Sequence, residues 1–277
     1  MKIEIPTLKS LYIEMYFDET KLSSGTATLI AKNKESYLTL VTNRHNVTGR
    51  HQETGECLSK YAAEPNAIVI HFHANIENEP VGNHWKTIRL PLYRNDGTPY
   101  WIEHPRLGSK ADIVALNLTW GDDIHKYTYY LETELDSVNM VLSPAETVSV
   151  IGFPFGLSSY GKLPIWATGF LAQELNLIDE SHPVFLIDCR SRQGQSGSPV
   201  IAYRTSSYRA LNDKGEEIVR MTGTKVWEFL GIYSGRVNPQ SDLGVVWHVS
   251  ALHELFDAAE SDNRKRIEAK AAEQQNV

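Results

Sequence analysis

Short runs of apolar and β-branched residues, separated by turn residues, occupy most of the chain between residues 25 and 250. Runs of this length predict β-strands, and the polar residues 33–35 between the first two predict a hairpin. The predicted strands are residues 25–32, 36–43, 67–74, 86–92, 112–118, 147–153, 165–174, 183–189, 198–203, 227–235 and 244–250. Long helical periodicity is absent from this stretch, so the pattern favours an antiparallel barrel or sandwich over alternating β/α units.

Polar segments interrupt the strands and are predicted to be surface loops, at residues 49–66, 93–110 and 204–217. The acidic, irregular segment 119–146 is predicted to connect two halves of the molecule. Helix-forming residues take over at 250–275, with apolar residues at helical spacing near its start. We expect the beginning of this helix to pack on the barrel and its charged part, beyond about residue 262, to fray.

Composition narrows the class of protein. The 277 residues are 42% hydrophobic, enough for a sizeable core, and carry 27 Lys and Arg against 34 Asp and Glu. This acidic balance argues against nucleic acid or an anionic membrane as the main partner. The N-terminus does not resemble a secretory signal, and no apolar run approaches the roughly 20 residues that span a bilayer. With only Cys57 and Cys189, reduced thiols in the cytoplasm are expected.

The segment CRSRQGQSGSPV (189–200) holds Ser196 in a glycine-rich turn just before a predicted strand. A serine hydroxyl is a nucleophile only when a base can take its proton, and histidine titrates near neutrality. A carboxylate must then orient the imidazole and stabilise its charged form. His45 follows the second strand of the predicted hairpin, and Asp112 begins the strand in KADIVALNL. Together, these residues are candidates for a Ser-His-Asp triad.

The segments GTATLIAKNKESYLTLVTNRHN, KADIVALNL and RQGQSGSPV resemble the three signature blocks of trypsin-like serine peptidases, and most closely those of HtrA-like proteases. IGFPFGLSS (151–159) and ATGFLAQE (167–174) are similar to further family segments. This resemblance covers roughly residues 20–250. It implies an all-β fold of two six-stranded antiparallel β-barrels with a C-terminal helix. The implied divisions are an N-terminal barrel (1–130), a C-terminal barrel (131–250) and a helix and tail (251–277).

The same resemblance implies the roles of the site residues. Peptide hydrolysis would proceed through an acyl-enzyme, with no cofactor and with a polypeptide as substrate. The backbone amides of Gly194 and Ser196 would form the oxyanion hole. The strand IYSG (232–235) would pair with the substrate backbone. Residues expected to border the first specificity pocket are Arg190, Tyr233, Ser234 and Gly235.

Arg190 has two interpretations. Inside the pocket, it would favour an acidic substrate residue. Otherwise Arg190 and Arg192 are solvated or paired with Asp188.

Several positions depart from the family pattern. Gln195 stands where the family has Asn or Asp, and Ser198 stands where it has Gly. The long separation between His45 and Asp112 implies insertions over about 49–66 and 93–110. Too few residues follow position 250 for the PDZ module of HtrA proteases.

Alternatives remain open for the function of the cleft. A catalytically idle scaffold could bind peptides there, or a regulatory protein partner could gate the enzyme. His71 and His73 share a strand face, which would suit a metal ion, although an exposed pair alternating with buried Ile70 and Phe72 is the ordinary explanation. Cys189 could be a thiol nucleophile or a buried structural thiol.

Overall fold

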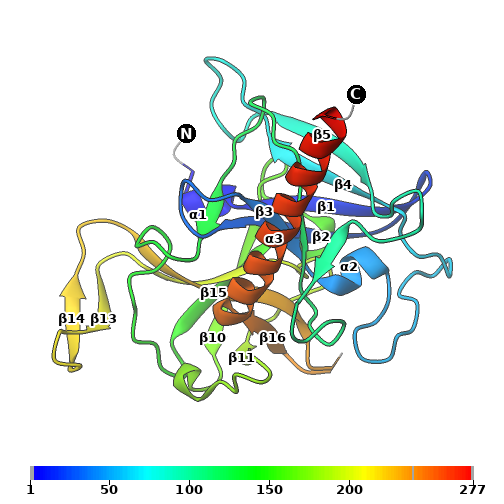
Figure 1. The fold of residues 1–277 in the computed structure, drawn as a ribbon. Coiled ribbons are helices and arrows are strands. Elements are labelled where there is room, and N and C mark those ends of the chain that lie inside the picture. Colours follow the sequence, from blue (N-terminus) through cyan, green and yellow to red (C-terminus); the bar gives the residue numbers. More distant parts are fainter. Residues whose placement is uncertain (1–2, 239, 276–277) are drawn as a thin grey trace.

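The computed structural model describes residues 3–238 and 240–275 as two β-sheets packed against each other and against a long helix (Figure 1). In this part of the chain, the N-terminal sheet has eight strands in the order β5-β4-β1-β2-β3-β7-β6, with β8 parallel to β2. Its strands are β1 (Ser10–Phe17), β2 (Thr20–Ala31), β3 (Thr39–Thr42), β4 (Ala67–His73), β5 (Trp85–Pro91), β6 (Trp101–Glu103), β7 (Val114–Leu116) and β8 (Thr128–Tyr130).

Strand β1 lies in the interior of this sheet, between β2 and β4, and was not among the predicted strands. Its signal was present in the sequence: Leu11, Ile13 and Met15 alternate along β1 and are buried in one apolar cluster. The predicted hairpin of residues 25–43 is confirmed, since β2 and β3 pair antiparallel.

The C-terminal sheet is a closed barrel, which in the described residues has six strands in the order β10-β11-β16-β15-β12-β9. Its interior is filled by an apolar cluster of its own, which includes Phe185, Ile187 and Val246. The strands are β9 (Thr147–Gly152), β10 (Ile165–Leu171), β11 (Val184–Asp188), β12 (Pro199–Arg204), β15 (Val226–Arg236) and β16 (Leu243–His248). The predicted fold class is thus confirmed, with an open sheet as its N-terminal half.

Two segments predicted to be irregular contain structure. A projecting hairpin of β13 (Ser207–Leu211) and β14 (Glu217–Met221) occupies the predicted loop 204–217, at the lower left of Figure 1. Most of its side chains are solvent-exposed, so no alternation of buried and exposed residues marks it. The acidic connection contains Asp136, which is completely buried and accepts hydrogen bonds from Lys9 and from the Trp227 indole. The Asp136 carboxylate therefore bonds to one residue from each half of the chain, Lys9 and Trp227.

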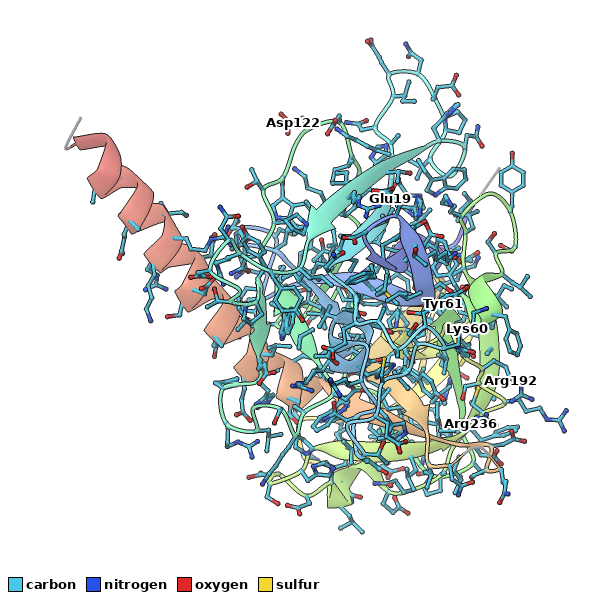
Figure 2. All side chains as sticks on the ribbon, turned by 90° about the vertical axis from the view of Figure 1, so that its right-hand side faces the viewer. Glu19, Lys60, Tyr61, Asp122, Arg192 and Arg236 are labelled. Carbon is cyan, nitrogen blue, oxygen red and sulfur yellow. The ribbon has the colours of Figure 1, made fainter. Side chains whose placement is uncertain are left out.

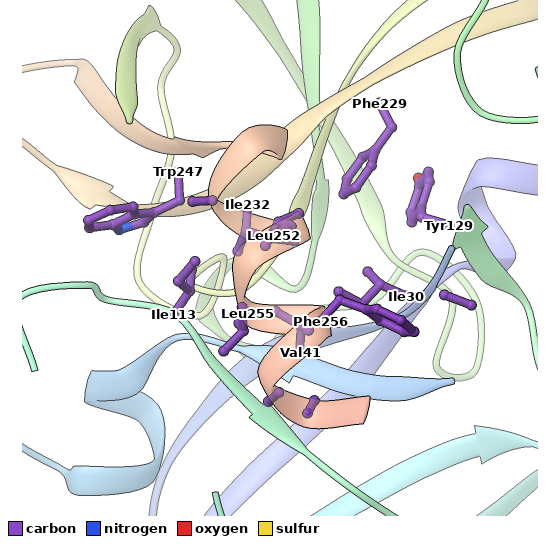
Figure 3. Packing of buried hydrophobic residues seen from close by; sticks show 14 of the residues in the cluster. Ile30, Val41, Ile113, Tyr129, Phe229, Ile232, Trp247, Leu252, Leu255 and Phe256 are labelled. Carbon is purple, nitrogen blue, oxygen red and sulfur yellow. The ribbon is translucent and has the colours of Figure 1, made fainter. Parts of the chain in front are cut away.

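The C-terminal helix α3 (Val249–Gln275) packs its first turns between the two sheets. Leu252, Leu255 and Phe256 belong to a cluster that also includes Ile113 from the N-terminal half and Ile232 from the barrel (Figure 3). The predicted docking of the helix is confirmed. The expected fraying beyond residue 262 was wrong, because the helix continues through Gln275 and extends away from the body (Figure 2). The remaining short helices are α1 (Ile5–Leu8), α2 (Arg44–Thr48), η1 (Pro154–Gly156) and η2 (Leu175–Leu177).

None of the helices in the described residues is both long and apolar enough to cross a membrane.

Candidate active site

A cleft of about 990 Å³ lies between the two sheets, and its walls come from both. The N-terminal half contributes His45 and Asp112, and the C-terminal half contributes Ser196 together with the backbone of Gly194. Residues from the long segment after α2, including Leu58, line the same cleft. The three residues predicted to form a triad therefore border one cavity, although at least 67 residues separate each from the next along the chain.

His45 lies on the single-turn helix α2, directly after β3, and its geometry is fixed by Asp112. The imidazole Nδ1 is 2.7 Å from Asp112 Oδ2, and the His45 backbone N–H donates to Oδ1 of the same carboxylate at 2.9 Å. Gly49 ends the helix in the left-handed conformation and donates its N–H to the His45 carbonyl. Both carboxylate oxygens of Asp112 thus hold the histidine, one through the ring and one through the main chain.

The charge environment favours a basic imidazole. The Asp112 side chain is only 3% exposed, and that of His45 is 17% exposed. Burial by itself would lower the pKa of His45, but the negative charge and hydrogen bond of Asp112 outweigh it and raise this pKa above its ordinary value. With Nδ1 bonded to the carboxylate, Nε2 is the nitrogen left to accept a proton.

Ser234 connects the two sides of the cleft. Its hydroxyl donates to Asp112 Oδ2, and its carbonyl accepts a hydrogen bond of 3.0 Å from the Ser196 hydroxyl. In the described part of the chain, the Ser196 hydroxyl makes this bond and none to His45. The structure therefore brings the serine and histidine into one cavity without joining them by a hydrogen bond.

The turn around Ser196 leaves two backbone amides without an acceptor. The N–H groups of Gln195, Gly197 and Ser198 all donate to carbonyls of the protein. Those of Gly194 and Ser196 make no hydrogen bond within residues 3–238 and 240–275, and both residues line the cleft. Unsatisfied backbone donors at a cavity are available to a ligand, and the transition state of acyl transfer develops negative charge on an oxygen.

The conformation of this turn requires glycine. Gly194 has φ of +94°, and an added Cβ would come within 2.4 Å of the Phe153 carbonyl. The Gln193 carbonyl accepts a short hydrogen bond of 2.6 Å from the N–H of Phe155. Because the peptide bond is planar and trans, the Gly194 N–H points away from that carbonyl. The contact with Phe155 thereby fixes the direction of the Gly194 amide.

Phe155, in η1, has a positive φ of 54°, which is uncommon for a bulky side chain, and its ring is 64% exposed. The sequence offered no sign of this conformation beyond the likeness of segment 151–159 to its family counterpart.

Of the predicted pocket residues, Tyr233, Ser234 and Gly235 line the cleft, whereas Arg190 does not appear in its wall. The Arg190 side chain is 86% exposed, and its charged group lies 3.9 Å from Asp242. Arg192 does line the cleft and also approaches Asp242, at 3.6 Å. Of the two interpretations, the solvated one therefore fits Arg190, and the acidic residue that both arginines approach is Asp242 in place of Asp188.

Tyr233 is 2% exposed, and its hydroxyl is hydrogen-bonded to that of Ser191, so the ring is held in the buried part of the barrel beside the cleft.

The two histidines considered for a metal site lie on β4, and both are buried, contrary to the exposed pair expected. His71 Nε2 is 3.0 Å from Glu14, and its Nδ1 is 2.9 Å from the Thr87 hydroxyl. His73 packs against Trp85 and Tyr127, and burial lowers its pKa to about 4. Among the described residues, no group of three or more His, Cys, Asp or Glu side chains is arranged to hold a metal ion.

Cys189 is a poor candidate for a nucleophile. Its side chain is buried in the barrel cluster. Burial, followed by the nearby charges of Asp188 and Asp242, raises the pKa of Cys189 to about 11. A thiol of this pKa is almost entirely protonated at neutral pH and is therefore unreactive.

Comparisons with known proteins give distant structural matches only. No family model matches the chain, and no curated protein sequence matches it. Solved structures that do match include the active form of the Rv3671c protease from M. tuberculosis, at 13% identity and a TM-score of 0.47, covering 91% of this chain and 81% of that one. The serine endoprotease from Yersinia pestis matches at 11% identity and a TM-score of 0.48, covering 94% and 69%. With identities this low, any activity must be inferred from the residues of the cleft itself.

Proposed function

We propose that this chain is a serine endopeptidase that hydrolyses peptide bonds with Ser196 as nucleophile, His45 as general base and Asp112 as the orienting acid. One observation carries the proposal: a His-Asp pair with a buried carboxylate borders the same cleft as Ser196, whose own backbone amide and that of Gly194 are unpaired in the described residues. Nucleophile, base and oxyanion donors are the parts that acyl transfer requires.

The first step would begin with a rotation of the Ser196 hydroxyl from the Ser234 carbonyl towards His45 Nε2. The serine oxygen attacks the substrate carbonyl carbon as Nε2 takes its proton. The resulting oxyanion accepts hydrogen bonds from the amides of Gly194 and Ser196. Asp112 stabilises the imidazolium that forms.

Collapse of this intermediate breaks the peptide C–N bond and leaves the acyl group on Ser196 as an ester. The imidazolium gives its proton to the leaving amine. Water then attacks the ester with His45 as base again, releasing the carboxylic acid and restoring the serine. The end of β15, from Ser234 to Gly235, is the segment along which we expect the substrate backbone to lie.

A fluorophosphonate probe tests this proposal directly, because it modifies only a serine that is activated. We expect covalent labelling of the wild type and none of Ser196→Ala or His45→Ala. Circular dichroism of each variant serves as the control for folding. Labelling that persists in Ser196→Ala would place the reaction at another residue and contradict the proposal.

The hydrogen bond from Ser196 to Ser234 favours a second candidate, a scaffold that is catalytically idle or is gated by a regulatory partner. In that case the isolated wild type would resist the probe. Labelling that appears only after addition of cell extract would indicate gating. Resistance under both conditions would indicate a peptide-binding scaffold.

A further inference from the structure

Thr26 of β2 makes contacts that the mechanism above does not use. It is completely buried and belongs to the N-terminal sheet, yet two of its polar groups, the hydroxyl and the backbone N–H, bond to the turn that holds Ser196. Its hydroxyl donates to the Gly194 carbonyl at 3.0 Å, and its backbone N–H donates to the Ser196 carbonyl at 2.9 Å. Its own carbonyl accepts from the Thr42 hydroxyl at 2.8 Å.

The hydroxyl of Thr26 also accepts a hydrogen bond of 3.3 Å from the N–H of Phe153. Phe153 stands two residues before Phe155, whose N–H holds the Gln193 carbonyl. Gly194 lies between two peptide groups, and glycine rotates freely about both of its backbone bonds. Thr26 bonds directly to the Gly194 carbonyl, which belongs to the peptide after Gly194. Through Phe153 it also holds the segment whose Phe155 N–H bonds to the peptide before Gly194.

Two glycines of the C-terminal half leave space for Thr26 to approach the turn. An added Cβ on Gly152 would lie 2.7 Å from the Thr26 hydroxyl oxygen, and one on Gly197 would lie 2.0 Å from the Thr26 carbonyl oxygen. Either side chain would force the two sheets apart at this point. Two glycines of the C-terminal half thus make room for one threonine of the N-terminal half.

We propose that Thr26 is a positioning residue, whose hydroxyl fixes the orientation of the Gly194 amide and so keeps the oxyanion hole formed. This inference rests on the proposed peptidase function. Thr26 touches neither the nucleophile's hydroxyl nor the His-Asp pair through its side chain, so it acts only through the turn. The C-terminal barrel therefore depends on the opposite sheet for the geometry of its own catalytic loop.

Thr26→Val is the principal test, since valine has almost the same shape and lacks the hydroxyl. The rate constant of inactivation at saturating fluorophosphonate, kinact, should fall about 10- to 100-fold, at or below the loss typical of one oxyanion donor. The probe concentration giving half-maximal rate, KI, should change less than about threefold. The pH midpoint of kinact should stay at the wild-type value, because His45 and Asp112 are untouched. Thr26→Ser, which restores the hydroxyl, should recover most of the wild-type kinact.

Thr28→Val is the matched control. Thr28 lies two residues along the same strand, is also completely buried, and donates its hydroxyl to a main-chain carbonyl, that of Lys9, at 2.7 Å. The Thr28→Val variant should lower the thermal unfolding midpoint about as much as Thr26→Val does and leave kinact near the wild-type value.

Three outcomes would overturn the proposal: wild-type kinact in Thr26→Val, an equal loss in Thr28→Val, or no recovery in Thr26→Ser. Thr26→Ala supplies a second variant should valine prevent folding, with the same loss of kinact expected. Absence of labelling in the wild type would instead overturn the peptidase function, so the two failures are distinguishable.

Discussion

The two walls of the cleft hold their functional groups in place by different interactions. On the N-terminal side, the base is fixed by a charge and two hydrogen bonds within a single pair, His45 and Asp112. On the C-terminal side, the amides are fixed by backbone conformation, with Gly194 and Gly197 at φ of +94° and +88°. The His45–Asp112 pair is oriented by its own hydrogen bonds, whereas the glycine turn is oriented by the residues that pack around it. Substitutions on the N-terminal side should therefore lower the rate by removing a charge, and substitutions on the C-terminal side should lower it by shifting the backbone amides.

The largest expected effect comes from removing the charge on the base side. In Asp112→Asn, the hydrogen-bonding shape is kept, but the imidazole loses its partner charge and its enforced tautomer. We expect kcat to fall by about 10⁴, as for comparable changes in triads. The pKa of His45 should fall as well, because the carboxylate that raises it is gone. Rates of peptide hydrolysis measured from pH 5 to 9 would reveal both changes.

Asp188→Asn controls for that prediction, since this carboxylate is exposed and lies on β11 near the nucleophile in sequence. Its rate should stay within about twofold of the wild type. An equal loss in both variants would mean that net charge, and not the His-Asp pair, governs the rate.

A smaller effect is expected from a change of geometry on the other wall. Gly194→Ala forces an alanine into a left-handed conformation with its Cβ 2.4 Å from the Phe153 carbonyl, so the turn must shift. Loss of one oxyanion donor lowers kcat by about 10²–10³, and we expect a decrease in that range. Steady-state kinetics with a quenched fluorescent peptide would measure it.

Gly215→Ala provides the comparison, because Gly215 has φ of +76° but open space around its Cβ position. Its turn, between β13 and β14, lies away from the cleft residues, so kcat should be unchanged. A wild-type kcat in Gly194→Ala would show that the turn is not held as the structure indicates.

The smallest effect requires no substitution. A general base must be neutral, and the pKa of His45 is raised above its ordinary value, near 6.5. The rate should therefore rise with pH, with a midpoint above about 6.5, and fall about tenfold per unit well below it. A flat profile between about pH 5 and 8 would be inconsistent with His45 as the base.

The same contrast explains what could be predicted from the sequence. His45, Asp112 and Ser196 are conspicuous because their side chains carry the proposed chemistry and each lies beside a recognisable strand. The hydrogen bond from Thr26 to Gly194 spans 168 residues and depends on the packing of two sheets. No local sequence pattern could therefore predict it. Ser234 was expected near the substrate, but its hydroxyl bond to Asp112 could be found only in three dimensions.

Strand prediction failed for comparable reasons. The strands β6 and β8 have three residues each, too few to establish a period of two. Strand β1, by contrast, shows the alternation and could have been predicted from it.

The helix α3 has a consequence for the order in which the molecule is assembled. The cluster between the two sheets includes residues as late as Ala259, although it begins with Ile30. Domains generally fold during synthesis from the N-terminus, at about 5–20 residues per second. A nascent chain can form its first sheet and its barrel, but the apolar surface between them stays incomplete until the helix emerges from the ribosome. The cleft that joins His45 to Ser196 therefore matures only after α3 has been synthesised.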